Sequence, residues 1–440
     1  MRVLPGLTEA APVERAREPR PRRRRLRPGL RPLPSRKLPA DLRAGAVGSI
    51  ATTLPRGVHD PAFEVLLRRI DRGPVLAGNQ VDVFDTGNAA FAAMQAAAAA
   101  AREEILLESY IFKDDEVGSR FLEIAAAAAR RGVMVRVLAD AAGSQATHRS
   151  FWGRMEEAGI EVRLFDLLQP RLWWLQPFRD HRKLLVVDRR IAFTGGMNIG
   201  EEYRSSHPMA GGGWRDTHIR VEGPTAWEMA VLFCETWRRA GGRAMRFEPL
   251  FHADRVDVGA QVLLLDSRPG RGHRESAAVL AAIAGAARQR LWITNPYFAP
   301  GRLGLRVVGE ASRRGVDVRL LLPGVADVPV LQRAARGYYG DLLESGVRIF
   351  EYQGAVLHAK SLVADGHVSV VGSTNLDFRS FLFNAECNLV VLDARCAERV
   401  EEIFRHDLAL SREVTTTSFS SRRALDRLAD RTARWLSPLL

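Results

Sequence analysis

Two stretches of the chain repeat the same spaced set of polar residues. The first, HRKLLVVDRRIAFTGGMNIG, covers residues 181 to 200, and the second, HAKSLVADGHVSVVGSTNLD, covers residues 358 to 377. Both read His, one residue, Lys, four residues, Asp, six residues, Gly, two residues, Asn, and we call this arrangement the polar frame. An imidazole, an ammonium and an amide at fixed spacing are suited to acid–base chemistry and to binding an anion.

Each polar frame lies in a segment that reads as strand, turn and returning strand. Residues i and i+2 of a strand share a face, so the histidine and lysine of a frame point to one surface. The returning strand brings the asparagine back to the same end. The groups that converge are His181, Lys183 and Asn198 in the first frame and His358, Lys360 and Asn375 in the second.

Two frames facing each other would form a cradle for a phosphodiester. The lysines and asparagines would hold the non-bridging oxygens, one histidine would attack phosphorus, and the opposing histidine would protonate the leaving oxygen.

The lysines support this interpretation because lysine is rare in the chain. There are 60 Arg but only four Lys, and two of the four are Lys183 and Lys360. An ammonium is a compact point charge, whereas a guanidinium is a planar fork, so the two residues are not interchangeable in a site.

The frames belong to an internal repeat of alternating strands and helices. EEILLESYIF, GSRFLEIAAAAARRGVMVRVLAD and EEAGIEVRLF precede the first frame, and RQRLWITNPYF, LGLRVVGEASRRGVDVRLLLPG and LLESGVRIFEY precede the second. This pattern indicates a mainly parallel sheet covered by helices, with Gly132 and Gly315 ending equivalent helices. We expect an α/β fold with two pseudo-symmetric α/β/α domains and a shared active site at their interface.

The frame resembles the HxKxxxxDxxxxxxGxxN signature of the phospholipase D superfamily. Further stretches between residues 73 and 440 resemble its bacterial cardiolipin synthase branch, including ILLESYIFKDDEVGSRF, GGMNIGEEY, WRDTHIRVEGP, NPYFAPGRL and GSTNLDFRSFLFNAE. The resemblance implies two phospholipase D-like domains, at residues 60–245 and 246–412. The chain looks like the class without N-terminal transmembrane helices, since only a basic arm precedes these domains.

The resemblance also implies a two-step transfer without metal or cofactor, through a phosphatidyl-histidine. The superfamily's usual order makes His181 the nucleophile and His358 the general acid and base, although the sequence itself does not decide which histidine attacks. Asp188 and Asp365, the third members of the catalytic set, would brace the strands and lysines.

The resemblance assigns further roles around these groups. A carboxylate downstream of each histidine orients the imidazole in the family, and Asp216 and Glu386 stand in those places. Gly195 and Ser373 join the two asparagines in binding the phosphate. Gly196 replaces the serine in the first frame, where we expect a backbone N–H to serve instead.

Charge and apolar patterning suggest a membrane partner. The Pro/Arg-rich arm, residues 1–45, should be disordered; residues 1–43 hold 12 Arg and one Lys against four acids, out of a net charge of +13 for the chain. We interpret the arm as attracted to an anionic membrane surface rather than to nucleic acid, although a plain solvated tail fits equally well. No signal peptide or transmembrane run is apparent, and three cysteines without paired spacing fit a reducing compartment. The expected location is the cytoplasmic face of the bacterial membrane, as a peripheral protein.

Three segments add to this interpretation. A lip bracketed by prolines lies before the first frame and contains Trp173, Trp174, Leu175 and Phe178. This lip would dip into the bilayer or pack on the core. Residues 205–216 form a glycine-rich loop near the site. Residues 413–440 form a basic amphipathic helix that either lies on the membrane or docks on the protein, with one apolar stripe of Leu425, Leu428, Thr432, Trp435 and Leu439.

These observations predict a cardiolipin synthase-like phosphatidyltransferase. The substrates would be phosphatidylglycerol alone, or phosphatidylglycerol with phosphatidylethanolamine as donor. The alternative is a phospholipase D that transfers the phosphatidyl group to water, because the two activities share every catalytic residue. A silent lipid- or nucleic-acid-binding scaffold is disfavoured by two complete frames, and a nuclease by both frames lying in one chain.

Overall fold

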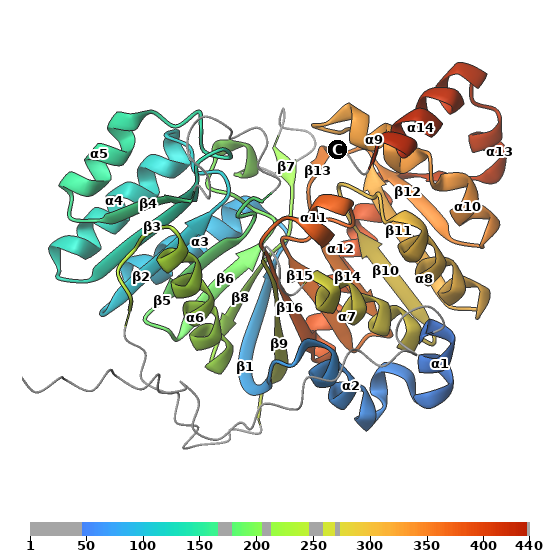
Figure 1. The fold of residues 1–440 in the computed structure, drawn as a ribbon, viewed down its shortest axis with the longest axis horizontal. Coiled ribbons are helices and arrows are strands. Elements are labelled where there is room, and N and C mark those ends of the chain that lie inside the picture. The colour runs from blue at the N-terminus through green and yellow to red at the C-terminus, as the bar shows by residue number, and fades with distance from the viewer. Residues whose placement is uncertain (1–45, 166–177, 205–212, 246–257, 269–272, 438–440) are drawn as a thin grey trace, which may run out of the picture.

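A computed structural model of the protein describes residues 46–165, 178–204, 213–245, 258–268 and 273–437. Within these ranges, fifteen strands form one sheet, in the order β17-β12-β11-β10-β14-β15-β16-β9-β1-β8-β6-β5-β2-β3-β4 (Figure 1). Strands β7 and β13 pair separately, above the middle of this sheet. The basic arm, the tryptophans of the expected lip and most of the glycine-rich loop lie outside the described residues.

The N-terminal half contributes one wing of the sheet. Strands β2, β3 and β4 run parallel, and the hairpin β5–β6, which carries the first polar frame, pairs antiparallel with β2. The strands of this half are β1 Val75–Phe84, β2 Glu104–Ser109, β3 Met134–Asp140, β4 Glu161–Phe165, β5 Lys183–Val187, β6 Ile191–Gly195, β7 Trp214–Arg215 and β8 His218–Glu222.

The C-terminal half repeats this arrangement. Strands β10, β11 and β12 run parallel, and the hairpin β14–β15, which carries the second frame, pairs antiparallel with β10. The strands are β9 Ala260–Ser267, β10 Arg290–Thr294, β11 Asp317–Pro323, β12 Arg348–Tyr352, β13 Val356–Leu357, β14 Ser361–Ala364, β15 Val368–Gly372, β16 Glu386–Leu392 and β17 Ser411–Val414.

Helices cover both faces of each wing, which explains why the strands are apolar throughout. In β5, Leu184 and Val186 pack with α6, whereas Leu185 and Val187 pack in the cluster of α3, α4 and α5. The helices of the first half are α1 Ala46–Thr53, α2 Pro61–Asp71, α3 Gly87–Ala99, α4 Glu116–Arg130, α5 Arg149–Glu157 and α6 Pro224–Arg239, with short 3₁₀ turns η2 Gly57–His59 and η4 Glu201–Tyr203.

In the second wing, α7, α8 and α10 pack on one face together with α1 and α2, and α12 packs on the other. One apolar cluster contains both α6 and α12, so it joins the two halves. The helices are α7 His273–Ala286, α8 Gly301–Arg313, α9 Pro329–Arg336, α10 Tyr339–Glu344, α11 Phe378–Leu382, α12 Ala394–Ala409, α13 Thr416–Ser420 and α14 Ala424–Leu436.

The predicted fold class is confirmed, because two similar α/β/α halves are present. Gly132 and Gly315 both have φ of +89° and follow the C-cap residues of α4 and α8, as the repeat predicts for left-handed helix ends. The division into residues 60–245 and 246–412 stays a prediction, since β1 and β9 pair and make the sheet continuous.

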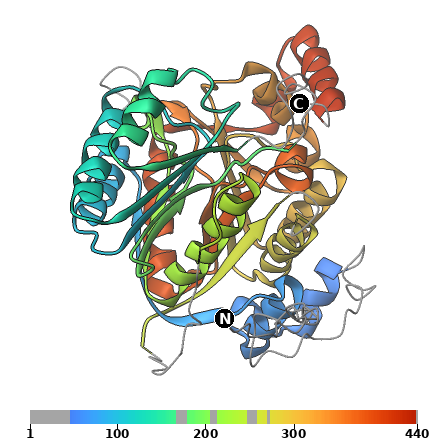
Figure 2. The same ribbon diagram turned by 60° about the vertical axis from the view of Figure 1, so that its left-hand side comes forward.

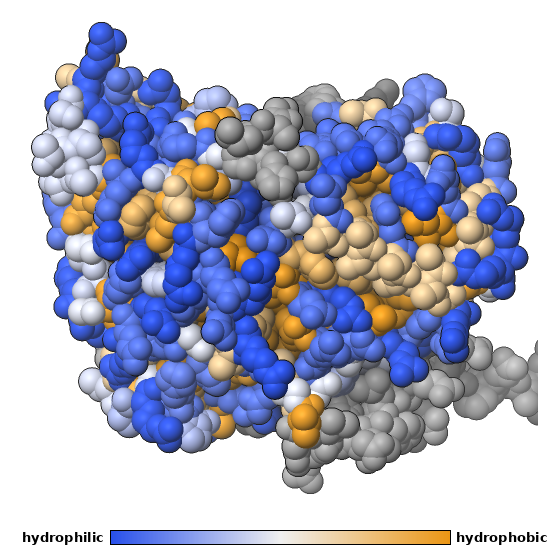
Figure 3. Space-filling model, turned by 180° about the vertical axis from the view of Figure 1, so that it is seen from behind, coloured by the Kyte–Doolittle hydropathy of each residue, from blue (hydrophilic) through white to orange (hydrophobic). Residues whose placement is uncertain are grey.

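Helices α1 and α2 lie at the end of the second half opposite to α13 and α14 (Figure 2). Seen from behind, a pale apolar surface covers the alanine-rich helices α3 and α4 (Figure 3). Within the described ranges, no helix is both long and apolar enough to cross a bilayer.

The C-terminal helix α14 was expected either to lie on the membrane or to dock on the protein, and it has features of both. It packs on α9 through its buried face at Asp430 and Ala433, and the Arg434 guanidinium lies 4.3 Å above the Tyr338 ring. The stripe points away from the protein, with Leu425, Leu428 and Trp435 exposed by 79%, 60% and 79%. The helix is therefore docked on the protein, and its apolar side faces outward.

Candidate active site

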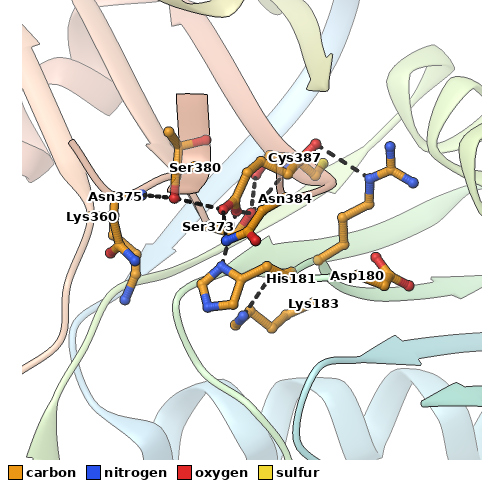
Figure 4. A network of polar contacts seen from close by, with 12 residues as sticks. Asp180, His181, Lys183, Lys360, Ser373, Asn375, Ser380, Asn384 and Cys387 are labelled. Carbon is orange, nitrogen blue, oxygen red and sulfur yellow. Dashed lines mark hydrogen bonds and ion pairs between the residues drawn. The ribbon is translucent and has the colours of Figure 1, made fainter. Parts of the chain in front are cut away.

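The two polar frames meet at one cavity, as the repeat predicts. His181, Asn198, His358 and Asn375 all line a cavity of about 260 Å³. Each histidine comes just before the first strand of its hairpin, and each asparagine follows the returning strand. Figure 4 shows His181 and Lys183 on one side, with Lys360 and Asn375 opposite.

Each histidine is held by a carboxylate from the other half of the chain. His181 Nδ1 lies 3.0 Å from Glu386 Oε2, and His358 Nδ1 lies 2.6 Å from Asp216 Oδ2. Asp216 and Glu386 therefore contact the imidazoles, as the resemblance implies, but each contacts the histidine of the other half and not the one upstream of it. The pairs cross because the segments carrying Asp216 and Glu386 each run alongside the histidine segment of the other half. We call this contact between the two halves the seam.

The backbone makes the same crossed connection. His181 donates its N–H to the carbonyl of Ala385 at 2.9 Å, and His358 donates to the carbonyl of Arg215 at 2.7 Å. In both cases the accepting residue directly precedes the carboxylate that contacts the ring. A two-residue unit of one half thus fixes both the backbone and the imidazole of the histidine in the other half.

This geometry leaves Nε2 of each histidine for chemistry in the cavity. With Nδ1–H donated to a carboxylate, the neutral ring carries its lone pair on Nε2. Burial lowers the pKa of His181 and lowers that of His358 to about 4. The carboxylate partners raise both pKa values, but the effect of burial is larger. Burial alone would raise the pKa of Asp216 and Glu386, but the neighbouring lysines and histidines hold both below their usual values.

The two lysines lie behind the histidines rather than on the cavity wall. Lys183 Nζ donates to the carbonyl of His181 at 2.6 Å, and Lys360 Nζ donates to the carbonyl of His358. Lys360 Nζ also lies 2.9 Å from His358 Nδ1, farther than the Asp216 carboxylate. Burial lowers the pKa of Lys183 to about 7 and that of Lys360 to about 8. Both lysines therefore exchange their proton near neutral pH.

The two frame aspartates lie far from the cavity. Asp188 accepts hydrogen bonds of 2.8 to 2.9 Å from the backbone of residues 102–104, and Asp365 accepts bonds of 2.7 to 2.9 Å from residues 288–290. They brace the strands, as expected. Their hydrogen bonds come from backbone N–H groups and not from the lysines. Each aspartate sits at the opposite end of its strand from the histidine and does not line the cavity, so it supports the strand and does not act on the substrate.

Ser373 and Gly195 do not line the cavity either, contrary to the phosphate-binding role expected of them. Ser373 Oγ donates to Glu386 Oε2 at 2.5 Å, and Ser380 and Asn384 donate to the other oxygen. The backbone of Gly195 instead packs against residues 217–218.

Gly196 has a steric role that its sequence position did not reveal. A Cβ atom there would lie 2.1 Å from Asp216 Oδ1, so the carboxylate fills the space that the Ser373 side chain fills in the other half. Glycine at this position lets Asp216 reach His358, which replaces the expected role for a backbone N–H.

Sequence reasoning missed the residues at the rim of the cavity. Tyr110 lies 5.0 Å from His181 between ring centroids, and its repeat counterpart Tyr297 lies 6.3 Å from His358. The tyrosine in SYIF and in PYF was the available signal. The same cavity is lined by Arg179, Trp214, Asp327 and Arg379.

Across the ranges that the structure covers, no group of three or more His, Cys, Asp or Glu side chains is placed to hold an ion.

Comparison with known proteins identifies the family. The family model described as "Cardiolipin synthase, PLD-like domain" matches residues 94–206 and 279–408. Cardiolipin synthase A of Pseudomonas putida is 34% identical over 377 residues, covering 84% of this chain and 77% of that protein. Cardiolipin synthase of Listeria innocua is 32% identical over 383 residues, covering 86% and 79%.

Solved structures show the same fold. Phosphatidylserine synthase of Haemophilus influenzae superposes with a TM-score of 0.68 at 12% identity, covering 86% of this chain and all of that one. Polyphosphate kinase of Porphyromonas gingivalis gives a TM-score of 0.51 at 14% identity, covering 84% of this chain and 54% of that one. With two matched domains and relatives above 30% identity across most of its length, the chain belongs to the cardiolipin synthase family of phospholipase D-like proteins.

Proposed function

We propose that the protein is a phosphatidyltransferase that makes cardiolipin from phosphatidylglycerol. One observation carries the proposal: two carboxylate-backed histidines, His181 and His358, line a single cavity. Double displacement at phosphorus needs a nucleophile and a proton donor on opposite sides of one phosphate, and each polar frame supplies one of them. Family membership supports the choice of a phospholipid as substrate.

The first step would transfer the phosphatidyl group to the protein. His181 Nε2 attacks phosphorus and forms a P–N bond, while the bond from phosphorus to the headgroup oxygen breaks. His358 gives its Nε2 proton to that oxygen, and glycerol leaves. The two frame asparagines would donate to the non-bridging oxygens, and Lys183 and Lys360, which lie behind the histidines, would add positive charge at longer range.

The second step would reverse these roles. A hydroxyl of a second phosphatidylglycerol gives its proton to His358 and attacks phosphorus, and the P–N bond breaks to free His181. In the free protein burial lowers the pKa of both imidazoles. The negative charge of a bound phosphodiester favours a protonated imidazole, so substrate binding would supply the acid of the first step.

The membrane surface is the proposed place of action. The outward stripe of α14 presents Leu425, Leu428 and Trp435, and it is flanked by the exposed Arg427 and Arg431. Apolar residues with arginines beside them suit the headgroup region of an anionic bilayer. Helix α9, on which α14 packs, contributes to the cavity rim, so this surface lies beside the site. We propose peripheral binding at the cytoplasmic face, with the basic arm adding attraction.

The test is product analysis with phosphatidylglycerol vesicles and a chelator of divalent metals. Cardiolipin and glycerol should appear in equal amounts. Formation of phosphatidic acid alone would overturn the proposal in favour of a phospholipase D that uses water. His181→Ala and His358→Ala should each abolish both products, and turnover by either variant would exclude the paired-histidine mechanism.

A further inference from the structure

The cavity rim breaks the pseudo-symmetry of the catalytic groups. Histidine, lysine, asparagine, tyrosine and a crossed carboxylate occur on both sides, but among the described residues that line the cavity the two arginines both lie on the side of His181. Counting from the frames, Arg179 corresponds to Val356, and Arg379 corresponds to Glu202. On the side of His358, the Tyr297 hydroxyl instead donates to the Asp327 carboxylate.

Both arginines are positioned by the seam. Arg179 precedes His181 by two residues on an extended segment, so their side chains share a face while Asp180 between them points into the core. Arg379 lies on α11, and its carbonyl accepts the N–H groups of residues 383 and 384. Both side chains line the 260 Å³ cavity and are half-buried.

Both guanidinium groups lie within electrostatic range of Tyr110. Burial and the negative charge of Asp140 raise the pKa of its hydroxyl, and the positive charges of Arg179 and Arg379 act in the opposite sense. Its ring lies against His181. Both arginines therefore act on one tyrosine, and they line the same cavity as the two catalytic histidines.

We propose that Arg179 and Arg379 bind the phosphodiester of the second, acceptor phospholipid. This inference rests on the proposed function, because cardiolipin synthesis brings two phosphodiesters into one site. The first occupies the space between the histidines. The second is joined to the attacking hydroxyl through the same glycerol, so it must lie within a few bonds of the reacting phosphorus, inside the same cavity.

The chemistry of the rim fits this ligand. A guanidinium binds phosphate with two parallel hydrogen bonds, and a half-buried guanidinium is less screened by water than a surface one. An acceptor phosphate is also the feature that water and simple alcohols lack. The arginines would therefore favour transfer to an anionic lipid over transfer to small hydroxyl compounds, through affinity for the acceptor and not through the chemical step.

The experiment is a competition between acceptors for one phosphatidyl-enzyme. Phosphatidylglycerol vesicles are incubated with a fixed concentration of 1-butanol, and cardiolipin and phosphatidylbutanol are measured together. Arg179→Gln and Arg379→Gln should each lower the ratio of cardiolipin to phosphatidylbutanol by roughly tenfold or more, the loss expected for a charged hydrogen bond. Because both products leave one intermediate, effects on folding or on donor binding cancel in the ratio.

Matched variants sharpen the result. Arg120→Gln, on the exposed face of α4 and paired with Glu123, should leave the ratio unchanged. Arg179→Lys should fall between wild type and Arg179→Gln, because it keeps the charge and loses the fork. An unchanged ratio in both glutamine variants would overturn the inference while leaving cardiolipin synthesis intact. Wild-type protein that makes phosphatidylbutanol but no cardiolipin would overturn the proposed function itself, and the inference with it.

Discussion

At the scale of single residues, the crossed carboxylates are what make the two histidines equivalent. Each imidazole has its Nδ1 edge fixed by the opposite half, which selects the tautomer with a free Nε2. Glu386 is itself held by three donors, from Ser373, Ser380 and Asn384, whereas Asp216 is held by the backbone N–H of Thr217. The two histidine–carboxylate contacts are thus alike, although the groups that hold the two carboxylates differ.

Glu386→Gln should lower kcat by roughly two to four orders of magnitude. The neutral amide cannot replace the carboxylate that accepts from His181 Nδ1–H, so it no longer fixes the imidazole. Ser373→Ala should cost much less, since two donors to Glu386 remain. Steady-state kinetics on phosphatidylglycerol would measure both effects, with Glu123→Gln on the exposed face of α4 as a control. A Glu386→Gln variant with wild-type kcat would show that the contact is not needed.

The lysines predict an alkaline limb in the pH profile of kcat/KM. Burial lowers the pKa of Lys183 to about 7 and of Lys360 to about 8. Below these values both are ammonium groups and attract the phosphate; as pH rises through them, the protons are lost and kcat/KM should fall. The profile of kcat/KM reports groups of the free enzyme, so kcat should change less.

Lys183→Arg provides the matching test. The guanidinium stays charged at all accessible pH values, so this variant should be weaker overall, because the fork does not fit the ammonium position. Its kcat/KM should also lose the part of the alkaline limb that Lys183 contributes. A variant with the same alkaline limb as wild type would assign that limb to another group.

The sequence was most informative about residues that lie within one frame. His181 and His358 were predicted to converge because strand alternation and a short hairpin place them by local rules. The carboxylate crossing and the rim arginines were not predictable, since both depend on how two distant segments pass each other at the seam. Gly196 was misinterpreted for the same reason: its constraint is the Asp216 side chain, which only the folded molecule brings near.

At the scale of elements, the repeat predicted the strand and helix order well, because each half shows the same period of apolar runs. The C-terminal segment was harder. A helix with one apolar stripe is compatible with docking through the stripe or away from it, and periodicity does not distinguish the two. The structure shows that Gly337 lets α14 approach closely: a Cβ there would lie 2.7 Å from the Asp430 carbonyl oxygen.

The outward stripe of α14 predicts a variant that separates stability from membrane binding. Leu428→Glu combined with Trp435→Glu should leave the thermal midpoint unchanged, because both side chains are exposed. Binding to anionic vesicles should weaken roughly tenfold or more, given the apolar burial that is lost. Vesicle sedimentation and calorimetry would measure the two quantities.

Val65→Glu is the control for this variant. Val65 is 42% exposed on α2, at the opposite end of the second half from α14, so it should not affect vesicle binding. Activity of the double variant on detergent-dispersed, short-chain lipid should match wild type. Unchanged vesicle binding would mean that α14 does not face the bilayer.

At the scale of the whole molecule, catalysis depends on the seam because neither half holds its own histidine. The buried Arg215 connects the halves: its side chain pairs with Asp407 of α12 at 2.7 Å, and its carbonyl accepts the backbone N–H of His358. The buried Arg182, also of the first half, makes a similar connection: it donates to Thr236 in its own half and to the carbonyl of Ser267 in the second half, each at 2.7 Å. Positioning and stability therefore share the same residues.

Asp407→Ala should consequently lower both stability and activity. Removing one partner leaves the Arg215 guanidinium buried without its carboxylate, which costs about 3–5 kcal/mol in free energy of unfolding. Glu413→Ala breaks the exposed pair with Arg348 and should cost about 0–1 kcal/mol. Urea unfolding would measure both losses, and equal losses would contradict a structural role for the seam pair.

Replacing Arg215 and Asp407 together by leucine should restore much of the stability, because no charge is left buried. If the double variant also keeps kcat/KM close to wild type, the Arg215 backbone alone is sufficient to position His358; if kcat/KM stays low, the ion pair itself holds the catalytic geometry.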